Sequence, residues 1–571
     1  MKARSVRSNS IPACRQPRAP YIDRIAAMHQ TARHPETATP KLGQVKPVSA
    51  GLLTKRFSTL YLFVIFSAAL IASHFSLLRL PYFWDEAGYY VPAARDLMAG
   101  SLIPHSTPSN AHPPLVLAWL AASWKLFGFH PAITRCAMLL LAAFSLVGFF
   151  RLARTVSSAA VAGWATLLTA IYPVFFAQSS LAQVDLPAAG LIFWGFESYS
   201  RKRDVACAIC FSAAVLAKET AILVPISLAV WEALALVFGG KRQEESPLGT
   251  PERHTFSLRR VIFLLAPLVP LGTWYAFHYA RTGFVFGNPE FFRYNAQATL
   301  HPLRILLALL LRLWQVTVYM NLYLLTIVCA LAMRQSPIEE PTGPRPRIAV
   351  SVQITFLTIA ALYVVALSVI GGAILARYLL PIVPLVILIW VSTVWRRLHM
   401  SNLVLAIVAA GFIAALFVNP PYGFAPEDNL AYRDCILLHQ RAERWLQARY
   451  PNARVLTAWP ASGELTKPDV GYVSKPMRIV RIENFTQEQL VSAAEVSSDF
   501  DVALVFSTKY EAHSVLDGWQ KWQEWKARYF DFHRDLPPEM AAAVLGGRLV
   551  YVERQRGQWI AIIVVERIER A

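Results

Sequence analysis

Residues 60–90 read LYLFVIFSAALIASHFSLLRLPYFWDEAGYY, an apolar run that ends in a pair of acids. The run over 60–78 is long and apolar enough for a transmembrane helix. Asp85 and Glu86 follow it closely. A charged side chain beside hydrocarbon costs on the order of 3 kcal/mol unless it reaches water or a partner, so such acids mark a candidate functional site. A helix cap is the other interpretation of Asp85, because Asp is a favoured N-cap residue and a helical pattern follows as far as Gly100.

The composition of the whole chain fixes its class. The 571 residues are 55% hydrophobic and only 16% charged, and the mean hydropathy is +0.39. This leaves too little polar surface for a soluble enzyme of this length, so we expect a polytopic helical membrane protein. The net charge of +19 sits in the N-terminal arm and in short loops between apolar runs. Basic residues in such short loops indicate which loops face the cytosol, and their placement argues against a nucleic-acid partner.

The N-terminal arm, residues 1–58, is rich in Arg, Lys, Pro and Ser. We expect it to be disordered and cytosolic. It is not typical of a cleavable signal peptide, because the first apolar core begins only near Leu60. The six cysteines are scattered, and Cys207 and Cys210 form a CxxC inside an apolar run, where we interpret them as packing residues.

Whether the segment 113–129 crosses the membrane decides on which side of the membrane all later loops lie. The segment is apolar but short and contains Lys125. If it crossed the membrane, the basic loops after it would lie outside, against the positive-inside rule. We therefore predict an interfacial helix there and about eleven crossings, with the N-terminus inside and the C-terminus outside. The predicted crossings are 60–78, 134–150, 156–176, 186–199, 205–217, 221–238, 261–279, a run within 303–333, 349–370, 379–395 and 403–418.

The same predicted topology places the conspicuous ionisable groups on the outer face of the membrane. Scattered charges at helix ends are usually interfacial anchors, which is the alternative for each of them taken singly. Their convergence on one face indicates an outward-facing cavity with acid-bearing loops and a basic lining, as expected for a lipid-linked phosphate substrate. The groups are Asp85, Glu86, His112, Asp185, Lys218, Glu219, Glu290 and Arg377.

The domain organisation follows from a change of composition. We predict a transmembrane catalytic domain over 59–420, with interfacial helices in its first outer loop at 80–133, and a soluble α/β module over 421–571. In the module we expect strands at 454–459, 501–507, 548–553 and 558–566, helices at 431–448 and 487–496, and a hairpin at 554–557. Its Glu464, Lys467 and Asp469 are interpreted as polar loop residues. The outer segment 281–301, with Asn288, Glu290, Tyr294 and Asn295, is long enough for a mobile lid.

Five motifs in order resemble the protein O-mannosyltransferase-like superfamily, of the glycosyltransferase family 39 type. The resemblance covers 60–394, and the superfamily includes bacterial aminoarabinose and galacturonic acid transferases that act on lipid A or core sugars. The motifs are Asp85-Glu86, His112-Pro-Pro-Leu115, Asp185, Ala217-Lys-Glu-Thr220 and Arg377-Tyr-Leu-Leu-Pro381.

The resemblance implies a membrane glycosyltransferase of the GT-C fold. Such an enzyme takes a sugar from a polyprenyl-phosphate donor and passes it to a lipid, glycan or protein acceptor. The family pattern also implies the bacterial cytoplasmic membrane, with the C-terminal module on the periplasmic side. Inversion at the anomeric carbon is the outcome expected from the family chemistry.

The predicted catalytic carboxylates are Asp85, Glu86 and Asp185. Asp85 is the expected base that takes the proton of the acceptor hydroxyl, and Asp185 orients the acceptor or shares that role. The leaving group is a lipid phosphate, whose developing charge needs cations in a low-dielectric pocket. We expect Lys218 and Arg377 to supply them.

The predicted substrate-binding set also contains Tyr378 and His112. A loop histidine before a helix start is the alternative interpretation of His112. Glu86 could pair with a cation or hold a metal with His112, but two candidate ligands from one loop are too few to specify a metal site. No metal and no cofactor other than the lipid-linked sugar donor is therefore predicted.

Two rival functions belong to other classes. A multispan lipid or sugar transporter or flippase would line a pathway with the same charges. No inverted repeat is evident, and the acids gather on one face rather than at mid-depth. A scaffold whose outer module recruits an assembly would tolerate the loss of Asp85.

Overall fold

The computed structural model describes residues 59–565 with some gaps, and residues 57–571 form one compact unit. The predicted basic arm, 1–58, lies outside the described residues. The gaps are 239–242, 246–250, 254–256, 288, 290–299, 342, 371, 511, 513–514 and 531.

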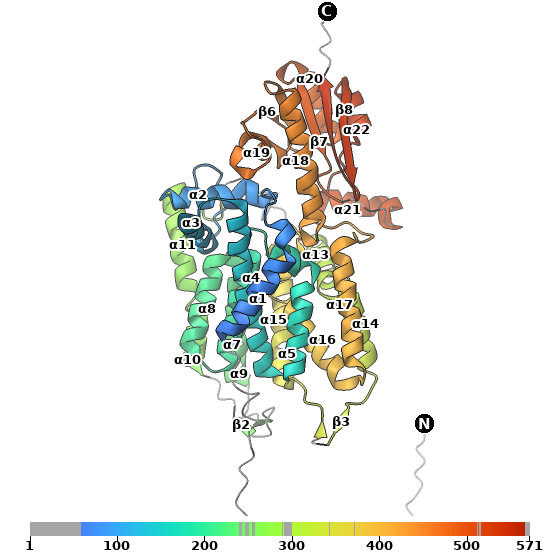
Figure 1. Cartoon of the computed structure of the whole chain (residues 1–571). Coiled ribbons are helices and arrows are strands. Elements are labelled where there is room, and N and C mark those ends of the chain that lie inside the picture. Colours follow the sequence, from blue (N-terminus) through green and yellow to red (C-terminus); the bar gives the residue numbers. More distant parts are fainter. Residues whose placement is uncertain are drawn as a thin grey trace, which may run out of the picture. The chain divides into compact units, whose positions relative to one another are not determined.

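Apolar helices make up the first part of the unit (Figure 1). Their cores share one hydrophobic cluster. In chain order they are α1 (Thr59–Ser73), α2 (Val91–Met98), α3 (Leu115–Phe127), α4 (Pro131–Val156), α5 (Ala159–Ile171), α6 (Pro173–Gln178), α7 (Asp185–Ser200), α8 (Asp204–Ala217), α9 (Leu223–Phe238), α10 (Leu258–Leu265), α11 (Leu268–Thr282), α13 (Pro302–Thr317), α14 (Leu322–Ala332), α15 (Val350–Ile370), α16 (Val383–Arg397) and α17 (Ser401–Phe417).

Helix α4 is the centre of the packing, because α1, α5 and α7 all lie against it. The contact with α7 is close at Gly190. A Cβ atom added there would lie 2.9 Å from the Cα atom of Ser145, so only glycine fits. Small residues at such crossings let two helix backbones approach each other, as is common in membrane bundles. This contact fixes the start of α7, which carries Asp185.

Three described helices are long and apolar enough to cross a membrane: Pro131–Val156, Leu258–Thr282 and Val350–Ile370. Several shorter apolar helices accompany them, including α1, α3, α5, α8 and α17. The predicted helical architecture is confirmed in this coarse form. The number of crossings, about eleven in the sequence prediction, stays a prediction.

The run within 303–333 differs from the single crossing predicted for it. The structure divides it into α13 and α14, which are bent by 77° at the break. Met320 and Asn321 have φ angles of 49° and 65° there, in the left-handed region. Two contacts hold this bend: the Asn321 amide donates to the carbonyl of Gly411 at 2.8 Å, and the backbone N–H of Met320 donates to the Tyr422 hydroxyl at 2.9 Å. Side-chain and tertiary contacts of this kind are not visible as a break in an apolar pattern.

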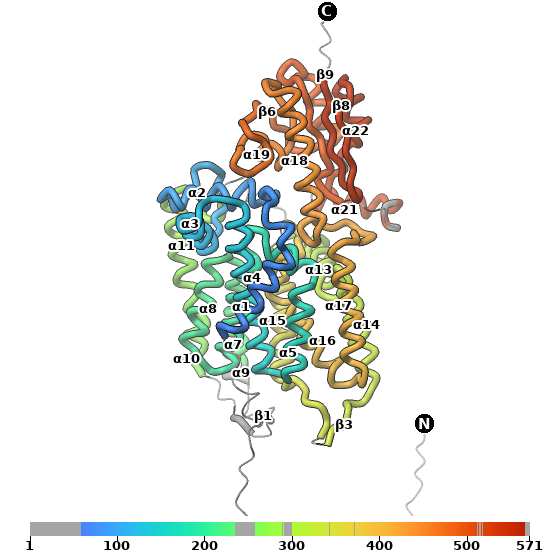
Figure 2. The backbone as a smooth tube through the Cα atoms, viewed as in Figure 1, coloured from blue at the N-terminus to red at the C-terminus, as the bar shows by residue number. Residues whose placement is uncertain are grey.

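The C-terminal module contains a five-stranded sheet in the order β6-β5-β7-β9-β8. The first three strands run parallel, while β9 is antiparallel to β7 and to β8. Figure 2 shows β8 and β9 side by side, joined by the predicted hairpin, whose Arg556 and Gly557 have positive φ angles. The strands are β5 (Arg454–Thr457), β6 (Arg478–Arg481), β7 (Val502–Phe506), β8 (Gly547–Gln555) and β9 (Gln558–Val565).

Helices cover this sheet and build its separate core. The expected strands and both expected helices are present. Strand β6 was not predicted, since its sequence Arg-Ile-Val-Arg is short and charged at both ends. The helices of the module are α18 (Ala431–Arg449), α19 (Ala461–Thr466), α20 (Gln487–Glu495), α21 (Gln520–Phe530) and α22 (Pro538–Val544).

The module holds the loop that carries Asp85. The backbone N–H of Tyr82 donates to the carbonyl of Val470 at 3.2 Å, and the Tyr472 hydroxyl donates to the carbonyl of Tyr82 at 2.9 Å. The rings of Trp84 and Trp459 meet edge to face with centroids 5.0 Å apart. Contacts with the module therefore help to fix the loop that carries Asp85.

Candidate active site

The guanidinium of Arg377 joins three carboxylates that come from distant parts of the chain. Its Nη2 donates to Asp85 Oδ2 at 2.6 Å, and its Nη1 donates to Glu427 Oε2 at 2.7 Å. Its Nε lies 3.4 Å from Asp185 Oδ2. Neither of these last two atoms makes a hydrogen bond with any described residue, although both are buried. The two atoms therefore form an ion-pair contact that has not closed into a hydrogen bond.

A short 3-10 helix between α15 and α16, Ala376–Leu379, carries Arg377. The segment before it is fixed by Arg312, a buried residue of α13. Arg312 donates to the carbonyl of Leu375 at 2.8 Å and to that of Ala373 at 3.2 Å. Arg377 is therefore presented by a backbone that has little freedom to move.

Asp185 and Lys218 form the second half of the site. Asp185 is the first residue of α7, and Lys218 follows the last residue of α8. Lys218 Nζ donates to Asp185 Oδ1 and lies 3.8 Å from the centre of the Tyr378 ring. A cation over an aromatic face is stabilised further when it is shielded from water, as here. The ring of Tyr378 therefore holds the ammonium of Lys218 beside Arg377.

A small polar pocket is lined by these residues, and an apolar pocket is lined by residues that neighbour some of them in sequence. The polar one has a cavity volume of only about 10 Å³ and is lined by Asp185, Ala188, Ile192, Lys218, Thr220, Ala221, Tyr363, Tyr378 and Pro381. The apolar one has a cavity volume of about 150 Å³ and is lined by Leu115, Val116, Trp119, Leu141, Phe144, Pro187, Leu191 and Ala217. Pro187 and Ala217 of the apolar pocket adjoin Ala188 and Lys218 of the polar one in sequence. This arrangement suits a molecule with a charged head and a hydrocarbon tail.

Asp85 precedes a short π-helix, Glu86–Tyr90, and occupies its N-cap position. Its side chain makes no capping hydrogen bond and is directed instead to Arg377. The cap interpretation is thus not supported. The preceding Trp84 has a φ of 44°, which is costly for a residue with a side chain and is maintained by packing such as its ring contact with Trp459.

Glu86 points away from this cluster. It is fully buried and pairs with Arg135 at the start of α4. Its Oε2 also accepts the backbone N–H of Phe83 at 2.7 Å, while Arg135 donates to the carbonyls of Pro81 and Ser180, each at 2.9 Å. These partners tie the loop that carries Asp85 and Glu86 to the helical bundle. The geometry therefore favours a structural role for Glu86 rather than the catalytic one predicted.

His112 lies beside the cluster and pairs with Glu219. Its Nδ1 is 2.8 Å from Glu219 Oε2, and its ring stacks on that of Tyr90 with centroids 5.9 Å apart. Burial opposes the ionisation of Glu219, but His112 and then Lys218 outweigh it and lower the pKa of Glu219 to about 2. Glu219 therefore stays ionised at neutral pH and holds His112 next to Lys218.

The structure brings together Asp85, Asp185, Lys218, Arg377 and Tyr378 from the predicted set. Sequence reasoning missed Glu427, which lies in a 3-10 helix, Pro426–Asp428, just after the last apolar run. Its signal was an adjacent pair of acids, Glu427 and Asp428, placed after a predicted crossing as Asp85 and Glu86 are. Most of the predicted lid, including Asn288, Glu290, Tyr294 and Asn295, lies outside the described residues.

Asp428 is buried under Tyr319, whose hydroxyl donates to its Oδ2 at 2.6 Å. Burial, reinforced by the neighbouring Glu427, raises the pKa of Asp428 to about 7. A carboxyl with a raised folded-state pKa contributes stability that is fully present below its unfolded value and is lost as pH rises through the folded value. Asp428 therefore favours unfolding progressively between its ordinary pKa near 4 and pH 7.

We expect Asp428→Asn to stabilise the protein by up to roughly 4 kcal/mol at pH 8 and by only roughly 2 kcal/mol at pH 5, where part of the cost of the buried charge is already present. The amide keeps an oxygen for Tyr319 and removes the buried charge. Thermal unfolding in detergent at both pH values measures the difference, with Asp499→Asn as a control at an exposed aspartate. An equal effect of Asp428→Asn at both pH values would contradict this account.

Comparison with known families supports the resemblance seen in the motifs. Residues 111–269 match the family model described as dolichyl-phosphate-mannose-protein mannosyltransferase. The resemblance is confirmed over this segment. It contains His112, Asp185 and Lys218, while Asp85 and Arg377 lie on either side of it. All the residues that line the apolar pocket and most of those that line the polar one fall within it. No curated protein matches the chain.

Several solved structures are similar to this chain. ArnT from Cupriavidus metallidurans, bound to undecaprenyl phosphate, is 14% identical, covers 87% of this chain and 97% of its own, and gives a TM-score of 0.49. The apo oligosaccharyltransferase of Archaeoglobus fulgidus is 12% identical, covers 79% and 70%, and gives 0.42. The oligosaccharyltransferase AglB from Archaeoglobus fulgidus, in complex with an inhibitory peptide and a dolichol-phosphate, is 12% identical, covers 90% and 75%, and gives 0.37.

Proposed function

We propose that the chain is a membrane glycosyltransferase that moves a sugar from a polyprenyl-phosphate donor to a hydroxyl or phosphate acceptor. The observation that carries this proposal is the Arg377 cluster, where Asp85 and Asp185 meet two buried cations beside an apolar pocket. The matched family is described by the same chemistry, transfer of a sugar from a lipid phosphate. Which sugar is transferred, and whether the acceptor is lipid A, another glycan or a protein, is left open by these residues.

The donor phosphate would bind Lys218 and Arg377. Both cations are paired with carboxylates in this structure, so an arriving phosphate would compete with Asp185 and Asp85 for them. That exchange would release a carboxylate for catalysis only when the donor is present. The polyprenyl tail would leave along the apolar pocket that adjoins Lys218.

Asp85 is the better placed of the two acids to act as base. Its side chain is 21% exposed, whereas that of Asp185 is 2% exposed, so only Asp85 can readily reach an acceptor from outside. In the step we propose, the acceptor oxygen forms a bond to the anomeric carbon and its proton passes to Asp85. The bond from that carbon to the phosphate oxygen breaks, and polyprenyl phosphate leaves on Lys218 and Arg377. Attack from the side opposite the phosphate would invert the anomeric centre.

Glu427 would limit how strongly Arg377 attracts the phosphate. Burial raises the pKa of Glu427 and Asp85 raises it further, while Arg377 acts in the opposite direction. Gln183 donates to the same carboxylate at 3.0 Å and keeps it in place. Glu427 is thus a positioning residue for Arg377 in this proposal.

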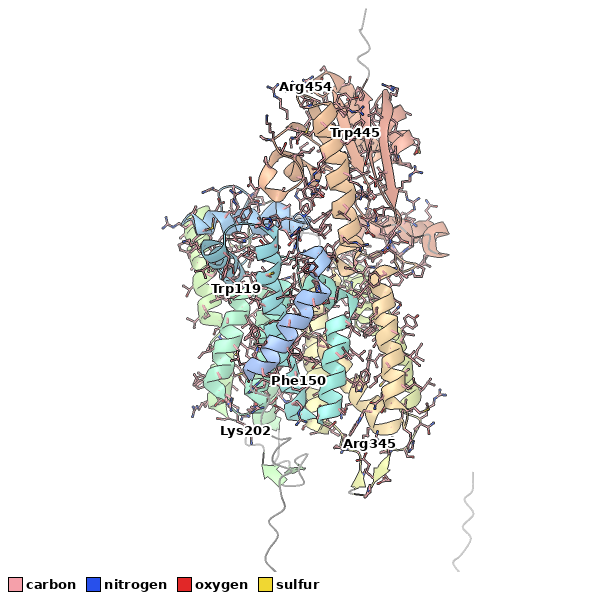
Figure 3. All side chains as sticks on the ribbon, viewed as in Figure 1. Trp119, Phe150, Lys202, Arg345, Trp445 and Arg454 are labelled. Carbon is pink, nitrogen blue, oxygen red and sulfur yellow. The ribbon has the colours of Figure 1, made fainter. Side chains whose placement is uncertain are left out.

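The membrane topology belongs to the same proposal: eleven crossings, with the site on the outer face of the bacterial cytoplasmic membrane. Figure 3 shows the basic residues Lys202 and Arg345 at one end of the helical bundle. The C-terminal module, which contains Arg454, lies at the opposite end. An excess of Lys and Arg at one end of a bundle is typical of its cytoplasmic side. This placement supports a periplasmic position for the module and for the Asp85 loop.

A test of phosphate binding uses Arg377→Lys. Lysine keeps the charge but cannot make the forked contacts to two or more oxygens, so we expect undecaprenyl phosphate to bind about 10- to 100-fold more weakly. Binding is measured on purified protein in detergent by titration with undecaprenyl phosphate, and folding is checked by thermal unfolding. Arg478→Lys, an exposed residue of β6, is the matched control. Unchanged affinity in a folded Arg377→Lys protein would refute the phosphate site.

A transporter is the second candidate, and the bent pair α13 and α14 favours it. Broken transmembrane helices are a feature of transporters, and α13 and α14 are bent by 77° at their break. The bend, however, is held by Asn321 and Met320 against Gly411 and Tyr422, and Asp85, Asp185, Lys218 and Arg377 lie on other elements. A transporter would move the donor across a bilayer without breaking its sugar-phosphate bond.

A further inference from the structure

A second cluster of buried polar side chains lies inside the C-terminal module. His439 and Glu443 are one turn apart on α18, and Glu464 is on α19. Their side chains are 4%, 0% and 3% exposed. Sequence reasoning interpreted Glu464 as a polar loop residue, which is wrong, since Glu464 is buried and bonded to His439. This cluster is not part of the Arg377 site and has no role in the proposed transfer.

The ligand atoms of these three residues converge. His439 Nδ1 lies 2.7 Å from Glu464 Oε2 and 3.7 Å from Glu443 Oε1. One nitrogen and two carboxylate oxygens all lie within 4.8 Å of one another. Two of the three residues come from a single helix at a spacing of four, which places their side chains on the same face before any ion arrives. Figure 1 shows α19 close to α18, on the side of the module that faces the helical bundle.

Glu443 is the unusual member of this cluster. Both of its carboxylate oxygens are buried, and neither makes a hydrogen bond with any described residue. A buried carboxylate without a hydrogen bond is costly, and here a second carboxylate lies beside it, while the ion-pair contact to His439 is a long one of 3.7 Å. One imidazole cannot compensate for both acids. The cluster therefore lacks positive charge at the point where its ligand atoms meet.

A divalent cation and a shared proton are the two ways to supply that charge. A proton shared by Glu443 and Glu464 would engage only one oxygen of Glu443. A divalent cation would bind that carboxylate directly and would use the nitrogen and the Glu464 oxygen as well. One imidazole and two carboxylates form a donor set that suits zinc and related first-row ions.

We propose that His439, Glu443 and Glu464 bind one divalent first-row metal ion, with zinc as the best-fitting ion. The ion would link α18 to α19. Residues Pro468–Val470 and Tyr472 follow α19 and hold Tyr82 of the Asp85 loop. The metal would therefore stabilise the module at the edge that contacts this loop. Because the three side chains are almost completely buried, the ion would enter as the module folds and exchange slowly afterwards.

The test measures metal in the full chain. Protein is produced in zinc-supplemented medium, purified in detergent, washed with chelator to remove surface-bound ions, and denatured in acid before elemental analysis. We expect about one zinc ion per chain in the wild type and a fall of about tenfold or more in Glu443→Gln and in Glu464→Gln. Glu495→Gln, an exposed residue of α20 in the same module, is the matched control and should keep its metal.

A second measurement does not depend on how well a variant folds. Wild-type protein produced with cobalt in place of zinc should show visible absorption bands of a protein-bound cobalt ion that persist after chelator washing. Folded wild-type protein without metal or such bands would overturn the proposal, and so would full metal content in folded Glu443→Gln and Glu464→Gln. A metal-free wild type that becomes more stable on Glu443→Gln would assign the cluster to a shared proton instead.

Discussion

Asp85→Asn is expected to lower sugar transfer by about 10² to 10⁴-fold while leaving donor binding within a few-fold of the wild type. Asparagine keeps the size of the side chain and an oxygen that can accept the 2.6 Å hydrogen bond from Arg377. It cannot take a proton from the acceptor. The loss should therefore appear in the rate of transfer and not in the affinity for polyprenyl phosphate.

The measurement compares purified wild type and Asp85→Asn for the transfer of labelled sugar from a polyprenyl-phosphate donor. Folding is matched by thermal unfolding of both proteins. Asp499→Asn makes the same chemical change at an exposed aspartate of the module and should be fully active. Undiminished transfer by Asp85→Asn would remove Asp85 from the mechanism. It would also be the result expected if the membrane part served only as a scaffold.

Glu86→Gln should act on stability instead, even though Glu86 is the direct neighbour of Asp85. The change leaves Arg135, which is 1% exposed, without its counter-charge. Breaking a buried ion pair by removing one partner typically costs about 3 to 5 kcal/mol, because the remaining charge is uncompensated. We expect a clear fall in the thermal unfolding temperature, with Glu495→Gln as the exposed control.

A second substitution separates this role from a catalytic one. Arg135→Gln added to Glu86→Gln removes the uncompensated charge, so the double variant should recover part of the lost stability. Transfer per folded molecule should remain measurable in it. A Glu86→Gln protein as stable as the wild type but inactive would show that Glu86 takes part in the chemistry.

The apolar pattern predicted where most helices lie but not how they bend or end. The ends of α7 and α15 were predicted to within one residue and those of α4 to within six, because a long apolar stretch has few other structures open to it. The break between α13 and α14 depends on Asn321, Met320 and their tertiary partners. Such contacts leave no trace in hydropathy. In the module, β7 is buried along its whole length and was predicted, whereas β6 was not.

The candidate site was predictable where a charge interrupts an apolar run. Asp85, Asp185, Lys218 and Arg377 were found in this way, and the structure places them in one cluster. Glu427 was missed because it lies beyond the last run, at the junction that was interpreted as the start of the soluble module. The pairing of Glu86 with Arg135 could not be predicted from the sequence either. An arginine at the start of a helix has the same appearance as an interfacial anchor, and only the fold brings the two side chains together.

The most direct test of the central claim follows both halves of the donor. Purified wild-type protein is incubated with a polyprenyl-phosphate donor that carries labelled sugar, together with an extracted pool of membrane acceptors. We predict that label moves to acceptor and that one free polyprenyl phosphate appears for each sugar transferred. In proteoliposomes, movement of the intact labelled donor across the bilayer with no release of polyprenyl phosphate would contradict the account and identify a transporter.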